Sequence, residues 1–229
     1  MTPERYAIYY VPDERATWAQ VCMAWLGWDM VAGQSLPHPD VPGVPNRISA
    51  LTAVPRRYGL HATIKPPFRM APGKTVLGLE RAVQDLAERQ TPITLDGLTL
   101  TPLGRFLALT VPGETGALDT MAARAVRTLD TFRAAPTPQE LARRRAARLT
   151  EAQEANLTNW GYPYVMESFR FHITLTSKLP KEDLNTIRCA LDDYLAPLLP
   201  RPFRIGDLAL VGEDSEGIFR LIRRFPLNG

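Results

Sequence analysis

The stretch YGLHATIKPPF, residues 58–68, predicts a short β-strand with polar side chains along one face. His61, Thr63 and Lys65 occupy every second position, where a buried strand would carry apolar residues. Because successive side chains of a strand point to opposite faces of its sheet, these three polar groups are expected to project from the same face. A polar face on a central strand indicates a functional site, particularly if the pattern recurs.

The pattern recurs in the second half of the chain, in FHITLTSKL, residues 171–179. In each half, a strand with the motif His-x-Thr is followed by a predicted helix and two further strands. The spacing between matched residues is nearly constant at 110–113 positions, as it is for the pairs His61 and His172, Leu98 and Leu208, and Phe106 and Phe219. An internal duplication, with copies at about 58–112 and 169–226, is the economical explanation.

Neither copy contains enough secondary structure to cover both faces of a sheet, so we expect the copies to pack as lobes of one α+β domain spanning residues 1–229. A Pro-rich loop at about 33–55 precedes the first copy, and a helical connection at about 117–158 joins the two. The length of the loop suggests that its segment 36–46 is a lid or one wall of a pocket, although an ordinary surface loop has the same composition.

Composition is ordinary for a water-soluble protein, and the mildly basic charge suits an anionic ligand without identifying one. Its net charge is +3, its apolar fraction 45% and its charged fraction 22%, and it has no apolar run of about 18 residues that could span a membrane. The segment 1–15 does not resemble a secretory signal, so we expect the protein in the cytoplasm. Cys22 and Cys189, in helical and apolar surroundings, are expected to be buried reduced thiols. The modest charge argues against long nucleic acid as a partner.

Two histidines at equivalent positions favour a reaction with two proton transfers. At neutral pH one imidazole is able to act as a base while the other donates a proton to a leaving group, which fits phosphodiester hydrolysis; the sequence leaves open which is which. Hydroxyls of Thr63 and Thr174 would bind the non-bridging oxygens. Lys65 would supply a positive charge on the same face, and Thr176 occupies the matching position in the second copy.

Metal is the main competing explanation for paired histidines. Catalytic zinc sites usually need three protein ligands, and no further His, Asp or Glu lies at a ligand-like spacing beside either motif. We therefore expect neither a metal nor another cofactor.

HATI and HITL, 111 residues apart, resemble the paired His-x-Thr signatures of the 2H phosphoesterase superfamily. A closer resemblance extends over nearly the whole chain, because WLGWD, RRYGLHATIKPPF, ELARRRAARLT and WGYPYVMESFRFHITLT are similar to segments of the branch called DUF1045, found among phosphonate metabolism proteins. The resemblance implies a LigT-like α+β fold, in which two pseudo-symmetric lobes with antiparallel-rich sheets and helices flank a cleft. It implies that His61 and His172 are the acid and base, without metal, and that Thr63 and Thr174 bind phosphate.

For the substrate, the resemblance implies a small cyclic phosphate ester, and the branch suggests 5-phosphoribosyl 1,2-cyclic phosphate from phosphonate breakdown. One alternative is the same chemistry on RNA or nucleotide 2′,3′-cyclic phosphates. Another is a protein that binds a cyclic nucleotide or phosphoribosyl ligand without turning it over. The expected partner is in each case a small phosphorylated sugar or nucleotide, and no membrane is expected.

A substrate with a second phosphate would need additional cations near the cleft. Arg143, Arg144 and Arg145 are candidates because consecutive helical positions are rotated by about 100°, so at least one would face inward; a solvated helix face is the alternative. Tyr164 would stack on a sugar or bind a phosphate, or else pack the start of the second His-x-Thr strand. His38, between two prolines, is expected at the surface.

Overall fold

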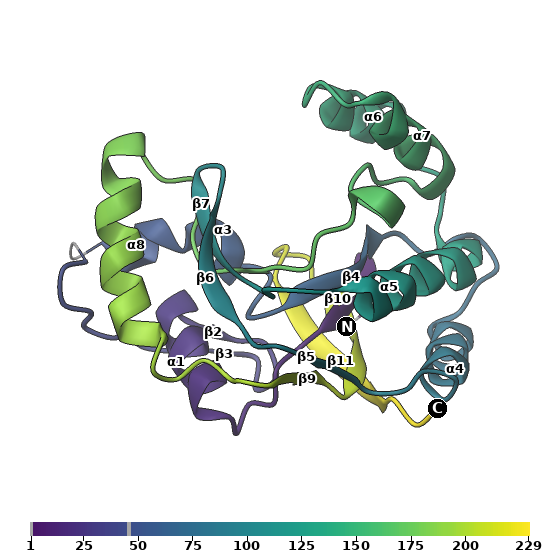
Figure 1. Cartoon of the computed structure of the whole chain (residues 1–229). Helices are drawn as coiled ribbons and strands as arrows, with labels where there is room; N and C mark the ends of the chain where they lie inside the picture. The colour runs from purple at the N-terminus through teal and green to yellow at the C-terminus, as the bar shows by residue number, and fades with distance from the viewer. Residues whose placement is uncertain (1, 45–46) are drawn as a thin grey trace.

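The structure, a computed structural model that describes residues 2–44 and 47–229, contains a seven-stranded sheet in the order β11-β10-β1-β4-β8-β7-β6, with helices at both ends (Figure 1). Every pairing of neighbouring strands in it is antiparallel. In sheet order, the strands are β11 (Phe219–Pro226), β10 (Asp207–Glu213), β1 (Arg5–Tyr10), β4 (Ala62–Phe68), β8 (Ile173–Thr174), β7 (Phe106–Thr110) and β6 (Thr99–Leu103).

Helices cover the sheet and connect its strands. They are α1 (Thr17–Leu26), α2 (Ile48–Leu51), α3 (Ala53–Arg56), α4 (Val76–Ala87), α5 (Gly116–Thr128), α6 (Pro138–Arg145), α7 (Glu151–Trp160) and α8 (Lys181–Leu195), with the 3-10 turns η1 (Asp130–Phe132) and η2 (Met166–Ser168). Two small sheets, β2 (Trp28–Asp29) with β3 (Gln34–Ser35) and β5 (Ile93–Leu95) with β9 (Phe203–Ile205), complete the secondary structure.

The two lobes of the molecule do not coincide with the two sequence copies. In one lobe, β4 and α4 of the first copy pack with the β10–β11 hairpin of the second, and β1 lies between β4 and β10. In the other, β8 and α8 of the second copy pack with the β6–β7 hairpin of the first. The crossing segments meet where β5 pairs with β9. The copies have therefore exchanged their hairpins, and each completes the sheet of the other.

The lobes meet at the His-x-Thr strands. Between β4 and β8, the ladder contains one residue pair, Ala62 with Ile173, and both side chains are fully buried. Helices α4 and α5 lie on one side of this junction, α1 and α8 lie on the other, and α6 and α7 project above it (Figure 1). The junction thus has a single pair of residues in its ladder and helices on both sides.

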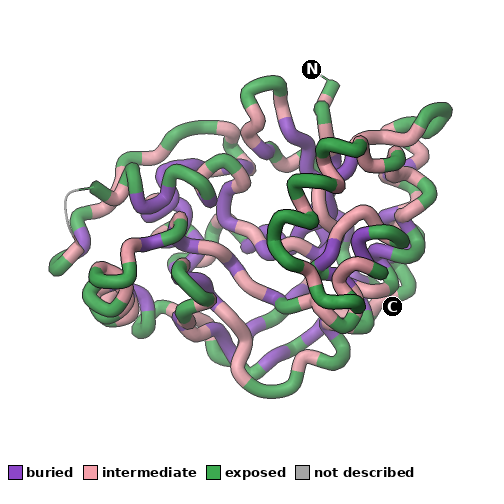
Figure 2. Tube along the Cα trace, turned by 90° about the horizontal axis from the view of Figure 1, so that it is seen from above, coloured by how far each residue is buried: buried purple, intermediate pink, exposed green. Residues whose placement is uncertain are grey.

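The hydrophobic core continues across the junction, and its buried segments run through the centre of the trace (Figure 2). Trp25 of α1 is fully buried, and its indole nitrogen donates a 2.8 Å hydrogen bond to the carbonyl of Leu175, the residue after β8. This bond ties α1 to the end of the second His-x-Thr strand.

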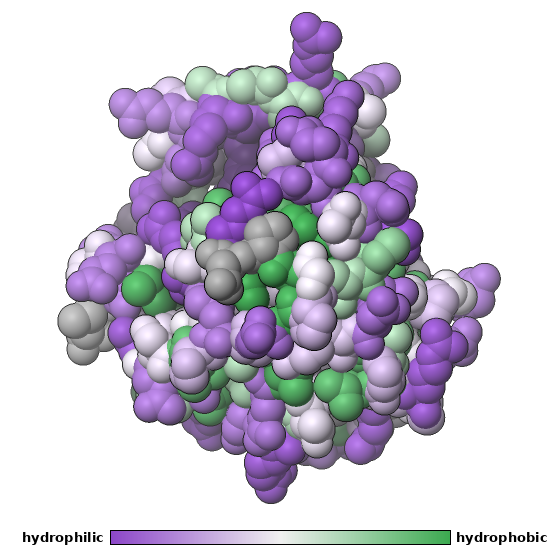
Figure 3. All heavy atoms as spheres, turned by 90° about the vertical axis from the view of Figure 1, so that its left-hand side faces the viewer, coloured by the Kyte–Doolittle hydropathy of each residue, from purple (hydrophilic) through white to green (hydrophobic). Residues whose placement is uncertain are grey.

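Few large apolar side chains are exposed. Those recorded among the described residues are Val54, Leu77, Tyr164, Leu198 and Ile222. They belong to different parts of the chain, and the face on the α8 side is mostly hydrophilic with hydrophobic residues near its centre (Figure 3). Scattered single residues of this kind are ordinary for a globular surface.

Several expected boundaries are corrected. The second His-x-Thr strand, expected within residues 171–179, is reduced to Ile173–Thr174, because the carbonyl of Arg170 accepts a hydrogen bond from a side chain and the amides of Leu175 and Thr176 share one carbonyl, which breaks the regular ladder. The helical connection expected at about 117–158 is divided into α5, η1, α6 and α7, and in the turn between α6 and α7 Arg148 has a positive φ of 53°.

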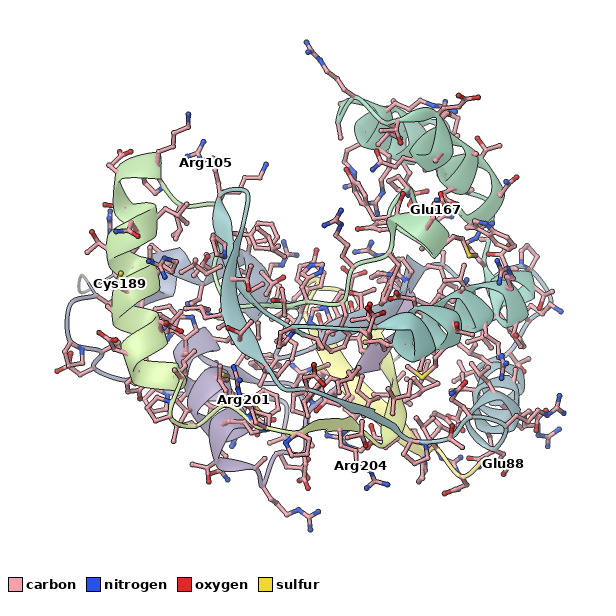
Figure 4. The ribbon with its side chains drawn as sticks, in the orientation of Figure 1. Glu88, Arg105, Glu167, Cys189, Arg201 and Arg204 are labelled. Atoms are coloured by element: carbon pink, nitrogen blue, oxygen red, sulfur yellow. The ribbon has the colours of Figure 1, made fainter. Side chains whose placement is uncertain are left out.

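Other sequence predictions are corrected by burial. Cys22 is buried as expected, but Cys189 is exposed and points outward from α8 (Figure 4). His38 is half-buried rather than exposed: its Nδ1 donates to the carbonyl of Trp25 at 3.0 Å, and Arg56 lies 3.1 Å from its Nε2. His38 therefore has a structural role.

Of the Pro-rich segment 36–46, the structure describes residues 36–44, and residues 45–46 lie outside the described residues. In its described part, Val41 is buried and Leu36 and Val44 pack against the core, while Gly43 lies close to Ala190 of α8. This part is a packed connection beside α8, which does not match the expectation of a lid.

Replacing Trp25 by Phe removes the indole donor and leaves the Leu175 carbonyl without it. We expect the free energy of unfolding to fall by about 2 kcal/mol, measured by urea denaturation. The matched control is Trp18→Phe, on the same helix, where no indole hydrogen bond is recorded among the described residues. Equal losses in the two variants would contradict the importance of the bond.

Candidate active site

The antiparallel register at the lobe junction brings the two His-x-Thr motifs together. With Ala62 opposite Ile173, continuing the register by one residue places His61 opposite Thr174 and Thr63 opposite His172. In an antiparallel pair, directly opposite side chains project from the same face. Because Ala62 and Ile173 point to the other face, into the core, the four polar side chains share the outer face.

These four side chains form a quadrilateral with a histidine and a threonine on each strand. The histidines occupy one diagonal and the threonines the other, and diagonal neighbours across two strands are separated by roughly 7–8 Å between Cα atoms. A tetrahedral group above the centre would have an imidazole on each of two opposite sides and a hydroxyl on each of the other two. We call His61, Thr63, His172 and Thr174 the His-Thr quartet.

Both imidazoles are oriented in the same way by the backbone. His61 Nδ1 donates to the carbonyl of Gly59 at 3.0 Å, and His172 Nδ1 donates to the carbonyl of Arg170 at 2.8 Å. A carbonyl oxygen only accepts, so Nδ1 carries the proton in each ring and Nε2 of the neutral ring is left as the acceptor. Thr63 Oγ1 lies 3.3 Å from His61 Nε2, which shows that Nε2 faces the quartet.

Aromatic rings cover the imidazole of His61. The ring of Tyr9 stacks on it with centroids 3.9 Å apart, and the ring of Tyr58 lies 6.0 Å away. Burial, which penalises the charged form, lowers the pKa of His61 to about 4, with a smaller lowering contribution from His172 and an opposing one from the bond to Gly59. His61 is therefore neutral at pH 7 in the ligand-free protein.

A pocket opens beside the quartet and is lined by three of its four residues. It is lined by Arg5, Tyr9, Val54, Pro55, Tyr58, His61, Thr63, Pro66, Pro67, Arg143, Arg144, Tyr162 and Thr174. The lining combines three residues of the quartet, His61, Thr63 and Thr174, with tyrosines and with arginines that come from β1 and α6. His172, the fourth member, is not part of this lining and lies at its border, opposite Thr63. In Figure 4, Arg105, on the hairpin between β6 and β7, and Glu167, on η2 below α6 and α7, lie on the two sides of this region.

The arginines of α6 point in different directions, as the helical rotation predicts. Arg143 and Arg144 line the pocket, and the guanidinium carbon of Arg144 lies 4.3 Å from the ring centroid of Tyr162. Arg145 instead forms an exposed ion pair with Glu154 of α7, at 2.6 Å. Of the three consecutive arginines, Arg143 and Arg144 therefore face the pocket and Arg145 faces the surface.

Lys65 does not share the face of the quartet, contrary to the sequence prediction. Thr63 pairs with Tyr9 and Lys65 with Ile8, so two residues of β4 span one of β1, and this bulge turns Lys65 to the opposite face. There Lys65 is 2% exposed, and its Nζ donates to the carbonyl of Val126 at 3.2 Å and to Asp130 at 3.4 Å. It anchors β4 to the end of α5.

Thr176 is displaced by a similar irregularity in the second copy. The amides of Leu175 and Thr176 both donate to the carbonyl of Leu107, which again inserts an extra residue. Thr176 is buried, and its hydroxyl accepts a 2.9 Å hydrogen bond from the amide of Leu107. The prediction that it faces a ligand is wrong.

Tyr164 was a candidate for stacking on the substrate, but its side chain is 42% exposed and is absent from the pocket lining. Tyr162, two residues earlier, lines the pocket and contacts Tyr164 edge to face at 5.7 Å. The candidate residue therefore lies near the pocket but outside it, and Tyr162 is the tyrosine of this segment that faces the pocket.

Among the pocket residues that were not singled out from the sequence, three carry polar or aromatic groups beside His61. Arg5, Tyr9 and Tyr58 reach the pocket because β1 lies beside β4 and α3 ends above it. Arg5 is pinned by Glu213, whose Oε1 accepts from its Nη2 at 2.6 Å. In the sequence, residues 6–11 form a continuous apolar and aromatic run that gives no sign of which side chains face a pocket, or that β1 inserts between the two copies.

Among residues 2–44 and 47–229, no group of three or more His, Cys, Asp or Glu side chains is arranged to hold a metal ion. Within the same residues, no helix has the length and apolar character needed to cross a bilayer.

Sequence comparison identifies a family and two curated relatives. The family model described as "Protein of unknown function (DUF1045)" matches residues 63–220, more than half of the chain. A protein of Janthinobacterium sp. (strain Marseille), named ribose 1,5-bisphosphate phosphokinase PhnN, is 38% identical over 231 residues, covering 98% of this chain and 51% of that protein. A protein of the same name from Laribacter hongkongensis (strain HLHK9) is 33% identical over 223 residues, covering 96% and 51%. The chain spans about half the length of these relatives.

Structural comparison finds similar solved structures. The protein TT0787 of Thermus thermophilus has 17% identity and a TM-score of 0.46, covering 98% of each chain. Escherichia coli LigT, solved with 3′-AMP, has 16% identity and a TM-score of 0.44, covering 99% of each chain.

The burial of His61 makes a prediction for its titration. We expect nitrogen NMR to show Nδ1 protonated and Nε2 unprotonated from pH 7 down to about pH 5, with a midpoint near the pKa of about 4. Because the unfolded chain, with a pKa near 6.5, binds more protons between these values, His61 should make stability rise with pH from about 4 to 6.5. Tyr58→Ala should move the midpoint upward by hydrating the ring. A wild-type midpoint near 6.5 would contradict the burial argument.

The correction for Lys65 makes a second prediction. Desolvation lowers the pKa of Lys65 from 10.5 to about 8, against the raising effect of Asp130. Between these values the unfolded chain binds more protons, so the stability of the wild type relative to Lys65→Met should rise from about pH 8 to 10.5. Denaturation of both proteins across this range measures the difference. A difference independent of pH would show that the ammonium is not buried in this way.

Proposed function

The chain belongs to the DUF1045 family, as its sequence segments predicted, and from that premise we propose that it is a cyclic phosphodiesterase that opens a small cyclic phosphate ester without a metal. The observation that carries this proposal is the His-Thr quartet at the lobe junction. The register puts an imidazole and a hydroxyl from each strand around one point, with Nδ1 of both rings held by the backbone, and two imidazoles with two hydroxyls match the needs of hydrolysis at phosphorus.

The proposed reaction is an in-line displacement. Neutral His61 accepts a proton from a water molecule through Nε2 as the water oxygen forms a bond to phosphorus. The bond between phosphorus and one ring ester oxygen breaks, and protonated His172 donates its Nε2 proton to that oxygen. The product is a ring-opened phosphate monoester, with one water consumed. The two histidines exchange protonation states and are reset through solvent.

The assignment of His61 as base follows from its surroundings. The stacked ring of Tyr9 and the resulting low pKa keep His61 neutral at pH 7, which a base requires. The hydroxyls of Thr63 and Thr174 would donate hydrogen bonds to the two non-bridging oxygens, on which negative charge builds in the transition state. The carbonyls of Gly59 and Arg170 would hold the two rings in place throughout.

We propose 5-phosphoribosyl 1,2-cyclic phosphate as the substrate. Opening its ring by release of the oxygen at carbon 2 leaves phosphates at carbons 1 and 5, which is ribose 1,5-bisphosphate, the compound in the names of the curated relatives. This chain lacks the G-x-x-x-x-G-K-[ST] nucleotide-binding motif, since Phe68 stands where Gly73-Lys74-Thr75 would need a preceding glycine. The kinase activity in the relatives' name is therefore not proposed for this chain, which spans about half of their length.

Hydrolysis of nucleotide or RNA 2′,3′-cyclic phosphates is the second candidate. It is supported by the tyrosines of the pocket, Tyr58 and Tyr162, which would offer stacking surfaces to a base. A binding protein without catalytic activity would use the same groups and would be recognised by its lack of turnover.

The test is a phosphorus NMR time course with excess EDTA, comparing 5-phosphoribosyl 1,2-cyclic phosphate with a set of ribonucleoside 2′,3′-cyclic phosphates. We expect metal-independent turnover of the first, and a loss of about 100- to 10,000-fold in kcat for His61→Ala and for His172→Ala. His38→Ala is the matched control and should retain activity, because His38 binds the backbone of α1.

Preference for the nucleoside substrates would favour the second candidate. Binding of every substrate without turnover would favour the binding protein, and activity that disappears with EDTA would contradict the metal-free mechanism.

A further inference from the structure

We propose that Arg143 and Arg144, with Arg5 beside them, form a second anion subsite that binds the non-reacting phosphate of a doubly phosphorylated substrate. This inference rests on the proposed function, because it assumes that the reacting phosphate occupies the His-Thr quartet. The inference adds that the pocket selects substrates that carry a second phosphate, which α6 would bind while the strands bind the reacting one.

The position of these arginines separates them from the quartet. They line the same pocket as His61, Thr63 and Thr174, but Arg143 and Arg144 come from the last turn of α6, which projects above the sheet (Figure 1). A substrate that spans the pocket therefore meets hydroxyls and imidazoles at one end and guanidinium groups at the other.

The charge of the pocket arginines is not balanced in the way that neighbouring arginines are. Carboxylates neutralise those around them, through the pairs Arg69–Glu140, Arg133–Asp130 and Arg145–Glu154. Within the described part of the chain, no carboxylate pairs with Arg143 or Arg144. Arg5 is paired with Glu213 and contributes a positioned but partly neutralised group. The pocket thus contains positive charges of Arg143 and Arg144 that a bound anion would neutralise.

Arg144 is also held in a fixed orientation. Its guanidinium carbon lies 4.3 Å from the ring centroid of Tyr162, a cation–π contact that holds the charge at the pocket wall. Two edges of a guanidinium match two oxygens of a phosphate, which makes such pairs shorter and stronger than neutral hydrogen bonds. Tyr162 therefore acts as the support for a phosphate-binding arginine.

The helix that carries these residues is built to keep its C-terminal turn in place. Thr137 caps α6 at its start, its hydroxyl accepting from the amide of Glu140 at 3.2 Å while the Glu140 carboxylate accepts from the amide of Thr137 at 2.7 Å. The same carboxylate accepts from Arg69 at 3.0 Å, which fastens the helix to the end of β4. No residue of α6 is buried, so these polar contacts, rather than core packing, position the arginines.

The experiment compares two substrates that differ only in the second phosphate: 5-phosphoribosyl 1,2-cyclic phosphate and ribosyl 1,2-cyclic phosphate. The variants are Arg143→Ala, Arg144→Ala and the double variant, with Arg145→Ala as the matched control. For the doubly phosphorylated substrate we expect kcat/KM to fall by roughly 10- to 100-fold in the double variant, mainly through KM. For the singly phosphorylated substrate, and for Arg145→Ala with either substrate, changes should stay within about twofold.

Equal losses on both substrates would overturn the subsite, as would a loss in Arg145→Ala as large as that in the double variant. Binding of ribose 5-phosphate by calorimetry separates this outcome from a failure of the proposed function. If the wild type turns over neither substrate but binds ribose 5-phosphate, and the double variant does not, the subsite stands and the proposed catalysis fails. If the double variant binds it as well as the wild type does, the subsite is wrong.

Discussion

One backbone pairing, between Ala62 and Ile173, sets the geometry on which the remaining features depend. Within the described part of the chain it is the only residue pair in the ladder between β4 and β8, so it determines which side chains of these two strands face each other. A shift of one residue would move every side chain of a strand to the other face and would bury the histidines while exposing Ala62. The buried core beneath Ala62 and Ile173 makes that shift costly. The register of the proposed catalytic groups is therefore secured by hydrophobic packing on the opposite side of the same strands.

The pocket combines an environment that disfavours positive charge with one that supplies it. Around His61, the rings of Tyr9 and Tyr58 exclude water and disfavour a positive charge, which keeps a base ready at neutral pH. Across the pocket, Arg143 and Arg144 present positive charge without carboxylate partners among the described residues. A substrate with two phosphates would place its reacting group in the first environment and its other phosphate in the second.

The α+β class and the meeting of the two His-x-Thr motifs could be predicted from the sequence, because both follow from alternation and from a repeat that the motifs mark. The sequence was insufficient for Lys65 and Thr176, since strict alternation places both on the face of the quartet and only the structure reveals the bulges that turn them away. Exchange of hairpins between the copies was also hidden, because pairing between segments over 100 residues apart leaves no local signal. The contribution of Arg5 depends on that exchange, through the insertion of β1 beside β4.

The most direct test of the central claim is a crystal structure of the protein with vanadate, which mimics the pentacoordinate phosphorus of the transition state. The account predicts one vanadate above the Ala62–Ile173 pair, with Nε2 of His61 and Nε2 of His172 at its two apical oxygens. The hydroxyls of Thr63 and Thr174 should donate to its equatorial oxygens. Vanadate bound by both histidines on the same side, or bound elsewhere in the pocket with the quartet empty, would contradict it.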